Sequence, residues 1–373
     1  METGIYLHIP FCRQKCFYCD FPSFAGREKY MESYTAAVLK EIKMRLAEFD
    51  KAATVYVGGG TPTVLPPSLL YQIVGALQPF CDAGTEFTVE ANPATVSLEL
   101  LSNLKSMGVT RLSIGVQSFD DRRLKKIGRI HTADEARMAV QMARKAGFDN
   151  VNIDIIYALP GETLNDVRQD VHEAVGCGTE HISIYGLQLE EGTVFHRLSE
   201  QGKLLLPDEE TAEKMYDHIM NELPRHGYYR YEISNFSKTG FESRHNLGYW
   251  QDKPYFGIGA AAHSYIAGQR FFNPMDIPEY IRKITAGILP LKEAEPATRD
   301  NQLAEYCFLA LRTTAGIDKV KFALRFGCDI ESIYGKQIEK LKAQKLLNET
   351  EHSFVLTELG MKYGNVAFAE FIL

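Results

Sequence analysis

Three cysteines near the amino terminus are the most chemically distinctive group in the sequence. Cys12, Cys16 and Cys19 are three of the chain's 7 cysteines. On a loop, this C-x3-C-x2-C spacing lets three sulfurs face one soft metal centre. A structural zinc site needs four ligands, and His8 is the nearest further candidate. An iron–sulfur cluster held by only three thiolates would leave one iron open to another ligand. Buried free thiols are the third interpretation.

Other candidate residues follow short β-rich segments further along the chain. The loop GGGTPT (58–63) follows one such segment, Glu90 and Gln117 lie at the ends of two others, and Arg129 follows soon after. Asp154 lies within a strongly apolar segment, where an unpaired buried carboxylate would be costly. Because the carboxyl ends of parallel strands meet at one edge of a sheet, we expect these residues to share one site with the cysteines.

Six β/α units must position this site. Nearly continuous runs of apolar and β-branched residues, typical of strands buried on both faces, begin at Ile5, Thr54, Glu86, Arg111, Val151 and His181. The stretches between them have apolar residues three or four apart, as helices do. This α/β pattern predicts a parallel sheet with crossover helices. A closed eight-unit barrel needs about 250 residues, so six units predict a partial, open (β/α)6 barrel.

The alternation fades after about residue 205, so we expect three regions, 1–205, 206–295 and 296–373. The second should contain a helix over 208–225 and an aromatic, glycine-rich stretch over 228–272. The third has short helical patterns and a hairpin pattern, LLNETEHSFVLTELG, typical of a mostly helical, winged-helix-like module. Its basic residues are mixed with acidic ones, which favours a packing module over DNA binding.

Composition excludes several classes of protein. The net charge of the 373 residues is −7, which argues against a general electrostatic interaction with nucleic acid. No apolar run reaches about 18 residues, so no transmembrane segment is expected. The first residues already follow a strand pattern, so we expect no secretory signal. An odd, unevenly spaced cysteine set then favours a reducing cytoplasm over a disulfide framework.

The cysteine spacing, with an aromatic residue before the last cysteine, resembles the radical S-adenosylmethionine (SAM) family. The resemblance implies that Cys12, Cys16 and Cys19 hold a [4Fe-4S] cluster in a radical SAM barrel. Its open iron would chelate the amine and carboxylate of SAM. Carried over by motif, the SAM contacts would be Tyr6, Tyr18, Gly59, Gly60, Thr61, Glu90, Gln117, Arg129 and Asp154.

The whole chain resembles the oxygen-independent coproporphyrinogen III oxidase-like family. YLHIPFC, GGGTPT, VEANP, RLSIGVQSF and ALPGET occur in the family's order. Asp20 and Phe21 stand where the oxidase continues to a fourth cysteine. The first strand pattern begins almost at Met1, so we expect no counterpart of the oxidase's extra N-terminal segment. Both departures match a sister family, the HemW-type haem chaperones. This resemblance implies haem binding and delivery to apo-haemoproteins such as respiratory enzymes. The alternative is oxidative decarboxylation of coproporphyrinogen to protoporphyrinogen IX.

The segment HNLGYW resembles the H-N-x-x-Y-W signature of those chaperones and holds the chain's only Trp. An imidazole can ligate haem iron, and aromatic rings can lie against a flat macrocycle. The alternative is a structural aromatic turn with its histidine hydrogen-bonded to backbone. The resemblance leaves open the recipient of haem, a homodimer and peripheral membrane contact. The haem-contact candidates are His245, Asn246, Tyr249 and Trp250, with His263 as a second candidate histidine.

Overall fold

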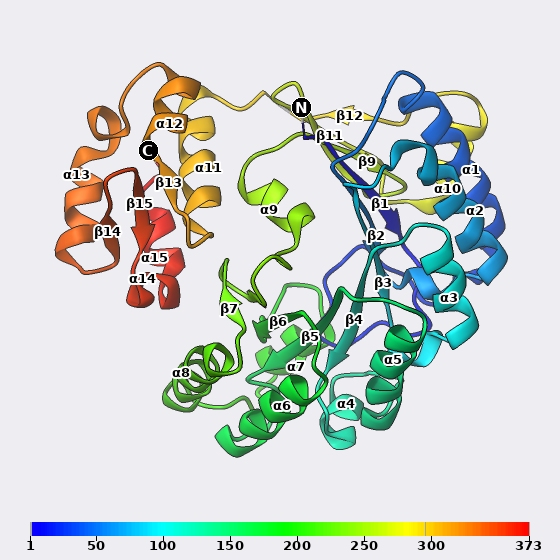
Figure 1. Cartoon of the computed structure of the whole chain (residues 1–373), viewed down its shortest axis with the longest axis horizontal. Helices are drawn as coiled ribbons and strands as arrows, with labels where there is room; N and C mark the ends of the chain where they lie inside the picture. Colours follow the sequence, from blue (N-terminus) through cyan, green and yellow to red (C-terminus); the bar gives the residue numbers. More distant parts are fainter. Residues whose placement is uncertain (1, 295, 373) are drawn as a thin grey trace.

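The computed structural model describes residues 2–294 and 296–372. Its central feature is a curved 12-stranded sheet whose middle six strands are parallel and lie in chain order (Figure 1). The sheet ends in unpaired edge strands, so it forms the predicted partial, open barrel. The six strands are β1 (Gly4–Ile9), β2 (Thr54–Gly59), β3 (Glu86–Ala91), β4 (Arg111–Gln117), β5 (Val151–Tyr157) and β6 (His181–Gly186).

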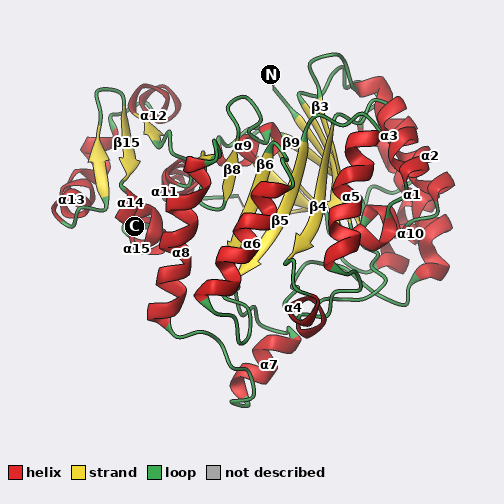
Figure 2. Ribbon diagram, turned by 60° about the horizontal axis from the view of Figure 1, so that its bottom comes forward, coloured by secondary structure: helices red, strands yellow, loops and turns green. Residues whose placement is uncertain are grey.

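Helices follow each of these strands, and α1, α2, α3, α5 and α6 cover the outer face of the sheet (Figure 2). Thr132 and Thr163 begin α5 and α6 with capping boxes, in which side chains accept the first free backbone N–H groups. The helices are α1 (Met31–Arg45), α2 (Pro67–Leu77), α3 (Leu98–Ser106), α4 (Asp121–Lys126), α5 (Ala133–Lys145), α6 (Leu164–Gly176) and α7 (Val194–Glu200). Short 3-10 helices are η1 (Glu28–Tyr30), η2 (Pro62–Val64), η3 (Gln78–Phe80) and η4 (Pro93–Thr95).

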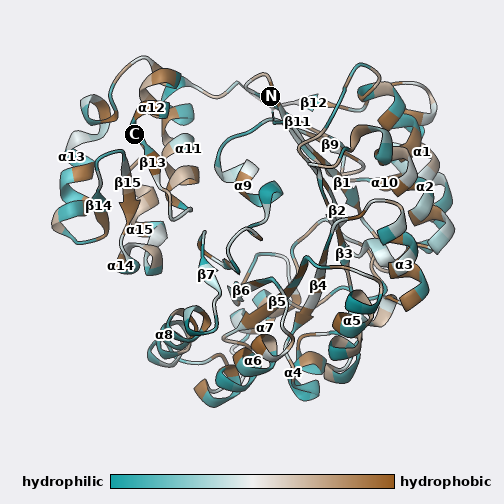
Figure 3. Cartoon of the chain, viewed as in Figure 1, coloured by the Kyte–Doolittle hydropathy of each residue, from teal (hydrophilic) through white to brown (hydrophobic). Residues whose placement is uncertain are grey.

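The two faces of the sheet differ in chemistry. The outward side chains, such as those of Leu7, Val57 and Val89, are apolar and buried against the helices. Hydrophobic residues, coloured brown in Figure 3, are prominent on β4 and β5. The inward side chains include Glu90 and Asp154, which line a cavity. The expectation of strands buried on both faces is confirmed, although the buried side chains of the inner face are largely polar. The physical reason is that this open sheet curves around a space that its own side chains do not fill, so the inner face stays polar.

Further strands extend the sheet at both edges. Next to β1 lie β9 (Tyr255–Ile258), β10 (His263–Ile266), β11 (Gln269–Phe272) and β12 (Lys292–Glu293); next to β6 lie β8 (Asn235–Ser237) and β7 (Tyr229–Arg230). Asp208 caps the predicted helix, observed as α8 (Glu209–Arg225). Two more helices are α9 (Arg244–Trp250), which lies within the curve of the sheet (Figure 1), and α10 (Ile277–Thr285).

The C-terminal module has its own hydrophobic core, which includes Leu303, Phe322 and Phe354. A hairpin packed among helices confirms the predicted winged-helix-like pattern. Its elements are α11 (Arg299–Leu311), β13 (Ile317–Asp318), α12 (Lys319–Phe326), α13 (Ile330–Ala343), β14 (Leu347–Glu349), β15 (Ser353–Leu356), α14 (Glu358–Lys362) and α15 (Gly364–Ala369). Within the two described ranges, no helix combines the length and the apolar character needed to cross a bilayer.

Candidate metal and cofactor site

The three cysteines lie on the loop that leaves β1 at the carboxyl rim, the edge where β1 to β6 end. Backbone hydrogen bonds hold the start of this loop: Cys12 N donates to Phe24 O at 3.1 Å and Thr61 N donates to Phe11 O at 2.8 Å. All three thiols are free and half-buried. Burial raises the pKa of the Cys12 and Cys19 thiols, an effect that a bound metal would reverse.

This donor set fits an iron–sulfur cluster. Sulfur ligands suit such clusters, and Cys12, Cys16 and Cys19 line the same cavity. In the part of the chain that the structure describes, no three His, Cys, Asp or Glu side chains converge on a single ion. The thiolates of a four-iron cluster bind separate irons, so their sulfurs need to surround a volume instead of meeting at a point. Asp20 and Phe21 line the cavity beside them, where a fourth cysteine would stand in the oxidase motif.

Arg129 supplies a positive charge beside the thiols. Its Nη1 donates to Cys16 Sγ at 3.5 Å, and its Nη2 donates to Gly115 O. Arg129 lies in the turn after α4, not on a helix, and lines the cavity. A guanidinium keeps its charge at any physiological pH, and here it would offset thiolate charge.

A cavity of about 420 Å³ extends from the thiols into the inside of the barrel. Tyr6 is not among its lining residues, and the Tyr6 hydroxyl is hydrogen-bonded to His8 Nδ1 at 2.8 Å. The other residues predicted to contact SAM all line it: Tyr18, Gly59, Gly60, Thr61, Glu90, Gln117, Arg129 and Asp154. Further lining residues were not predicted, although polar side chains at alternate strand positions could have indicated them: Tyr56, Arg111, Ser113, Asn152, Ser183 and Tyr185.

The glycine loop packs closely against β1 and the start of the cysteine loop. Gly59 has φ 108°, and a Cβ there would lie 2.4 Å from the His8 ring. A Cβ at Gly60 would lie 2.6 Å from Phe11 O. Both positions therefore require glycine before any ligand is considered. The expected approach of this backbone to a cofactor remains a prediction.

Two carboxylates face the cavity. Glu90 accepts hydrogen bonds from Tyr56 OH at 2.7 Å and Gly59 N at 3.0 Å. Burial raises the pKa of Glu90 to about 7 and also raises the pKa of Asp154. Asp154 accepts a hydrogen bond from Asn152 Nδ2 at 2.8 Å. Both carboxylates could accept hydrogen bonds from the ammonium or hydroxyl groups of a polar ligand.

Helix α9 packs against the amino ends of β2 and β3, opposite the thiols. His245 is 3% exposed, and both ring nitrogens have partners: Nδ1 pairs with Thr54 Oγ1 at 2.8 Å and Nε2 with Tyr249 OH at 2.9 Å. The Tyr56 ring stacks on it with centroids 5.0 Å apart. Burial lowers the pKa of His245 to about 3, so the imidazole is neutral. Its partners are side chains, not the backbone groups of the alternative interpretation.

The other residues of HNLGYW point to different surroundings. Asn246 lines the main cavity, while His245 and Tyr249 line a second cavity of about 250 Å³. The Arg312 guanidinium from the C-terminal module lies 4.5 Å from the Trp250 ring centre. His263, on β10, is exposed and stacks on Phe272. The segment therefore connects two cavities and the C-terminal module, with its histidine ring already hydrogen-bonded.

Comparison with known proteins agrees with this architecture. The Radical SAM superfamily model matches residues 6–174, and the HemN C-terminal domain model matches residues 297–362. The chain is 38% identical to "Heme chaperone HemW" of Bacillus subtilis over 98% of both chains. It is 40% identical to "Heme chaperone HemW" of Lactococcus lactis, over 100% of this chain and 97% of the relative.

A solved structure shares the whole fold at lower identity. The coproporphyrinogen III oxidase (HemN) of Escherichia coli aligns with a TM-score of 0.87 over 100% of this chain and 90% of its own, at 21% identity. That likeness confirms the expected fold. The full-length identity to the two curated relatives confirms the resemblance first drawn from motifs: the chain belongs to the HemW family within the radical SAM superfamily.

Proposed function

We propose that this protein binds haem and delivers it to apo-haemoproteins such as respiratory enzymes. We further propose that it carries a [4Fe-4S] cluster and SAM at the carboxyl rim. The observation that carries the proposal is full-length identity of 38% and 40% to proteins named as haem chaperones. The oxidase that shares the fold is only 21% identical.

Cys12, Cys16 and Cys19 would hold the cluster, which when bound supplies electrons to a ligand on its open iron. Arg129 would offset the charge of the thiolates from 3.5 Å. Glu90 and Asp154 would accept hydrogen bonds from the polar groups of SAM, and the glycine loop would lie along it. This assignment is supported by the shared cavity and by the family's motif order.

Haem, as cargo, would contact the segment that includes His245, Tyr249 and Trp250. The cavity of about 250 Å³ supports contact by His245 and Tyr249, which line it, and Trp250 lies outside that lining. Because both nitrogens of His245 are hydrogen-bonded, its imidazole would reach iron only after giving up Thr54 or Tyr249. A homodimer, peripheral membrane contact and residence in the cytoplasm remain predictions from the sequence.

Anaerobic haem titration tests the proposal. Reconstituted protein should show a shifted Soret band and a stable complex, measured with and without the cluster. The same preparation should form no protoporphyrinogen from coproporphyrinogen III, SAM and reductant. Formation of that product would favour the oxidase alternative, and absence of a haem complex would overturn the chaperone proposal.

Delivery needs a separate measurement. Haem-loaded protein is mixed with an apo-form of a respiratory b-type cytochrome, and the rate of transfer is followed against acceptor concentration. Direct delivery predicts a rate that rises with acceptor, since the two proteins must meet. A rate that stays constant at the haem dissociation rate would show passive release.

A further inference from the structure

We propose that Arg123 is a positioning residue for the cysteine loop, acting through the carboxyl end of α4. The inference concerns the cluster that the family implies, and it does not depend on haem binding. Arg123 itself does not line the cavity that the thiols line. Its influence would pass through backbone contacts that connect a buried charge network to Phe17 and Cys16.

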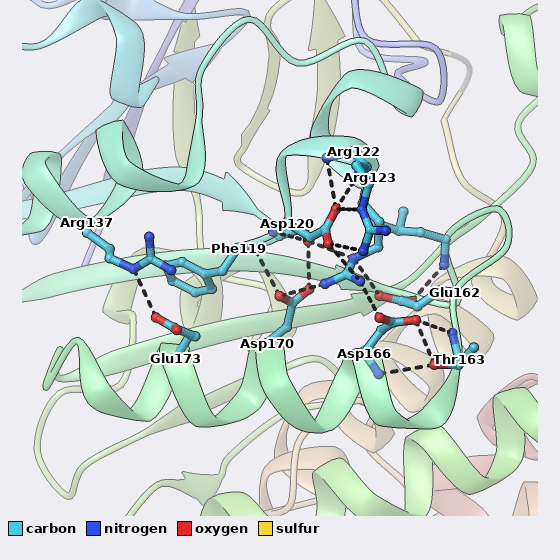
Figure 4. A network of polar contacts seen from close by, with 12 residues as sticks. Phe119, Asp120, Arg122, Arg123, Arg137, Glu162, Thr163, Asp166, Asp170 and Glu173 are labelled. Carbon is cyan, nitrogen blue, oxygen red and sulfur yellow. Dashed lines mark hydrogen bonds and ion pairs between the residues drawn. The ribbon is translucent and has the colours of Figure 1, made fainter.

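Arg123 is the centre of that network (Figure 4). Its guanidinium lies 2.8 Å from Asp166 Oδ1 and 3.1 Å from Asp170 Oδ1, both on α6. It also lies 3.6 Å from Glu162 Oε1 and donates to Ser118 Oγ at 3.0 Å. The Arg123 side chain is only 9% exposed. A short helix with six residues is thereby fixed to the much longer α6.

The loop that enters α4 is tied to the same centre. Asp170 accepts hydrogen bonds from Ser118 Oγ at 2.8 Å and from Phe119 N at 2.9 Å. Asp120 lies 3.8 Å from Arg123 and caps α4 by accepting from Arg122 N at 2.8 Å. Any movement that separated Arg123 from its carboxylates would leave a buried charge without a partner, which is costly. We therefore expect this network to hold α4 in one position.

The other end of α4 docks directly on the cysteine loop. Ile127 O accepts from Phe17 N at 3.0 Å, and Gly128 O accepts from Gln14 Nε2 at 3.0 Å. Gly128 has φ 77°, and a Cβ there would lie 3.0 Å from the Phe17 ring. Arg129 follows at once and contacts Cys16 Sγ at 3.5 Å.

The middle of the cysteine loop has few other backbone supports. Cys19 N donates to Cys16 O at 3.2 Å within the loop, and Phe195 N donates to Phe17 O at 2.9 Å. The bonds of Cys12 fix only the start of the loop. The position of Cys16 therefore depends on the end of α4, which depends on Arg123.

Hydrogen exchange of the metal-free protein tests this dependence without any cofactor. Arg123→Met should raise exchange of the Phe17 amide about tenfold, since its acceptor moves, and Arg123→Lys should give a smaller rise. Arg144→Met is the matched control, because Arg144 bridges to Glu180 at 2.8 Å away from α4. The control should leave exchange at Phe17 unchanged.

Anaerobic reconstitution gives the second readout. Arg123→Met should lower iron and sulfide per chain by about half or more and alter the change in the cluster's EPR spectrum on SAM addition. Haem binding should stay as in the parent protein, which separates failure of this inference from failure of the proposed function. A folded Arg123→Met protein with parental exchange and parental EPR spectrum would overturn the inference.

Gly128→Ala covers the case in which Arg123→Met does not fold. This variant keeps every charge of the network but places a methyl group against the Phe17 ring. It should raise Phe17 exchange and change the EPR response in the same direction. Parental behaviour of Gly128→Ala in both measurements would overturn the docking of α4 on the cysteine loop.

Discussion

The two ends of the barrel differ in whether their candidate ligand side chains are free or already hydrogen-bonded. At the carboxyl rim, backbone bonds hold loops that present Cys12, Cys16 and Cys19 half-buried and free. At the amino end, the His245 ring is buried with both nitrogens hydrogen-bonded to side chains. The three thiols are therefore available as metal ligands, whereas His245 would have to lose a hydrogen bond before its imidazole could bind iron.

Removal of one thiol should have the largest effect, and it tests whether the two ends act independently. Cys16→Ala should abolish the iron–sulfur absorbance after anaerobic reconstitution, because two thiolates do not hold a four-iron cluster. Cys328→Ser, a half-buried thiol in the C-terminal module, is the control and should keep the cluster. Haem binding to both variants should match the parent. Loss of haem binding with the cluster would show that the two ends are not independent.

Removal of the imidazole tests the amino end. His245→Ala should weaken haem binding, leave the cluster intact and lower the free energy of unfolding by about 2–4 kcal/mol, since Thr54 and Tyr249 lose buried partners. Denaturant unfolding and haem titration measure the two effects. Tyr249→Phe should cost only about 1 kcal/mol and release Nε2. Unchanged haem affinity in His245→Ala would refute an axial role.

The pH dependence of SAM binding tests the role of Glu90 at the carboxyl rim. The pKa of Glu90 is about 7 because burial raises it, so its carboxylate is mostly neutral at pH 6 and mostly ionised at pH 8. If the ionised form pairs with SAM, affinity measured by calorimetry should rise up to about tenfold between these values. Glu90→Gln should bind more weakly at pH 8 and lose this pH dependence. If Glu90→Gln kept the pH dependence of the parent protein, a group other than Glu90 would be its cause.

The smallest effect concerns stability near α4. Burial raises the pKa of Glu162 to about 8 from 4.5, so folding favours the protonated form. Its unfavourable contribution is absent below the unfolded pKa and grows as pH rises from about 4.5 to 8. Glu162→Gln should therefore raise Tm by about 2–4 °C at pH 8 and leave it nearly unchanged at pH 4.5. Equal changes in Tm at both pH values would show that ionisation of Glu162 is not the cause.

Local patterns predicted much of the fold. Apolar β-branched runs marked all six parallel strands, and the pattern over 208–225 marked α8, because strand burial and helix formation depend largely on neighbouring residues. Motif spacing placed Cys16 and Glu90 at strand ends that meet in one cavity. The polar inner face was missed, because Arg111 and Asn152 look unremarkable until the sheet curves and brings alternate residues together.

The sequence by itself determined the thiol set, the β/α order and the chain's family, since each depends on residue type and spacing. Tertiary structure alone decided which groups are free. Arg129 is hydrogen-bonded to Cys16, which is 113 positions away in sequence, and His245 to Thr54, which is 191 positions away. Hydrogen bonds between residues so distant in sequence form only when the folded sheet brings them together. That is why the histidine of HNLGYW proved to be already hydrogen-bonded, while the three cysteines remained free thiols.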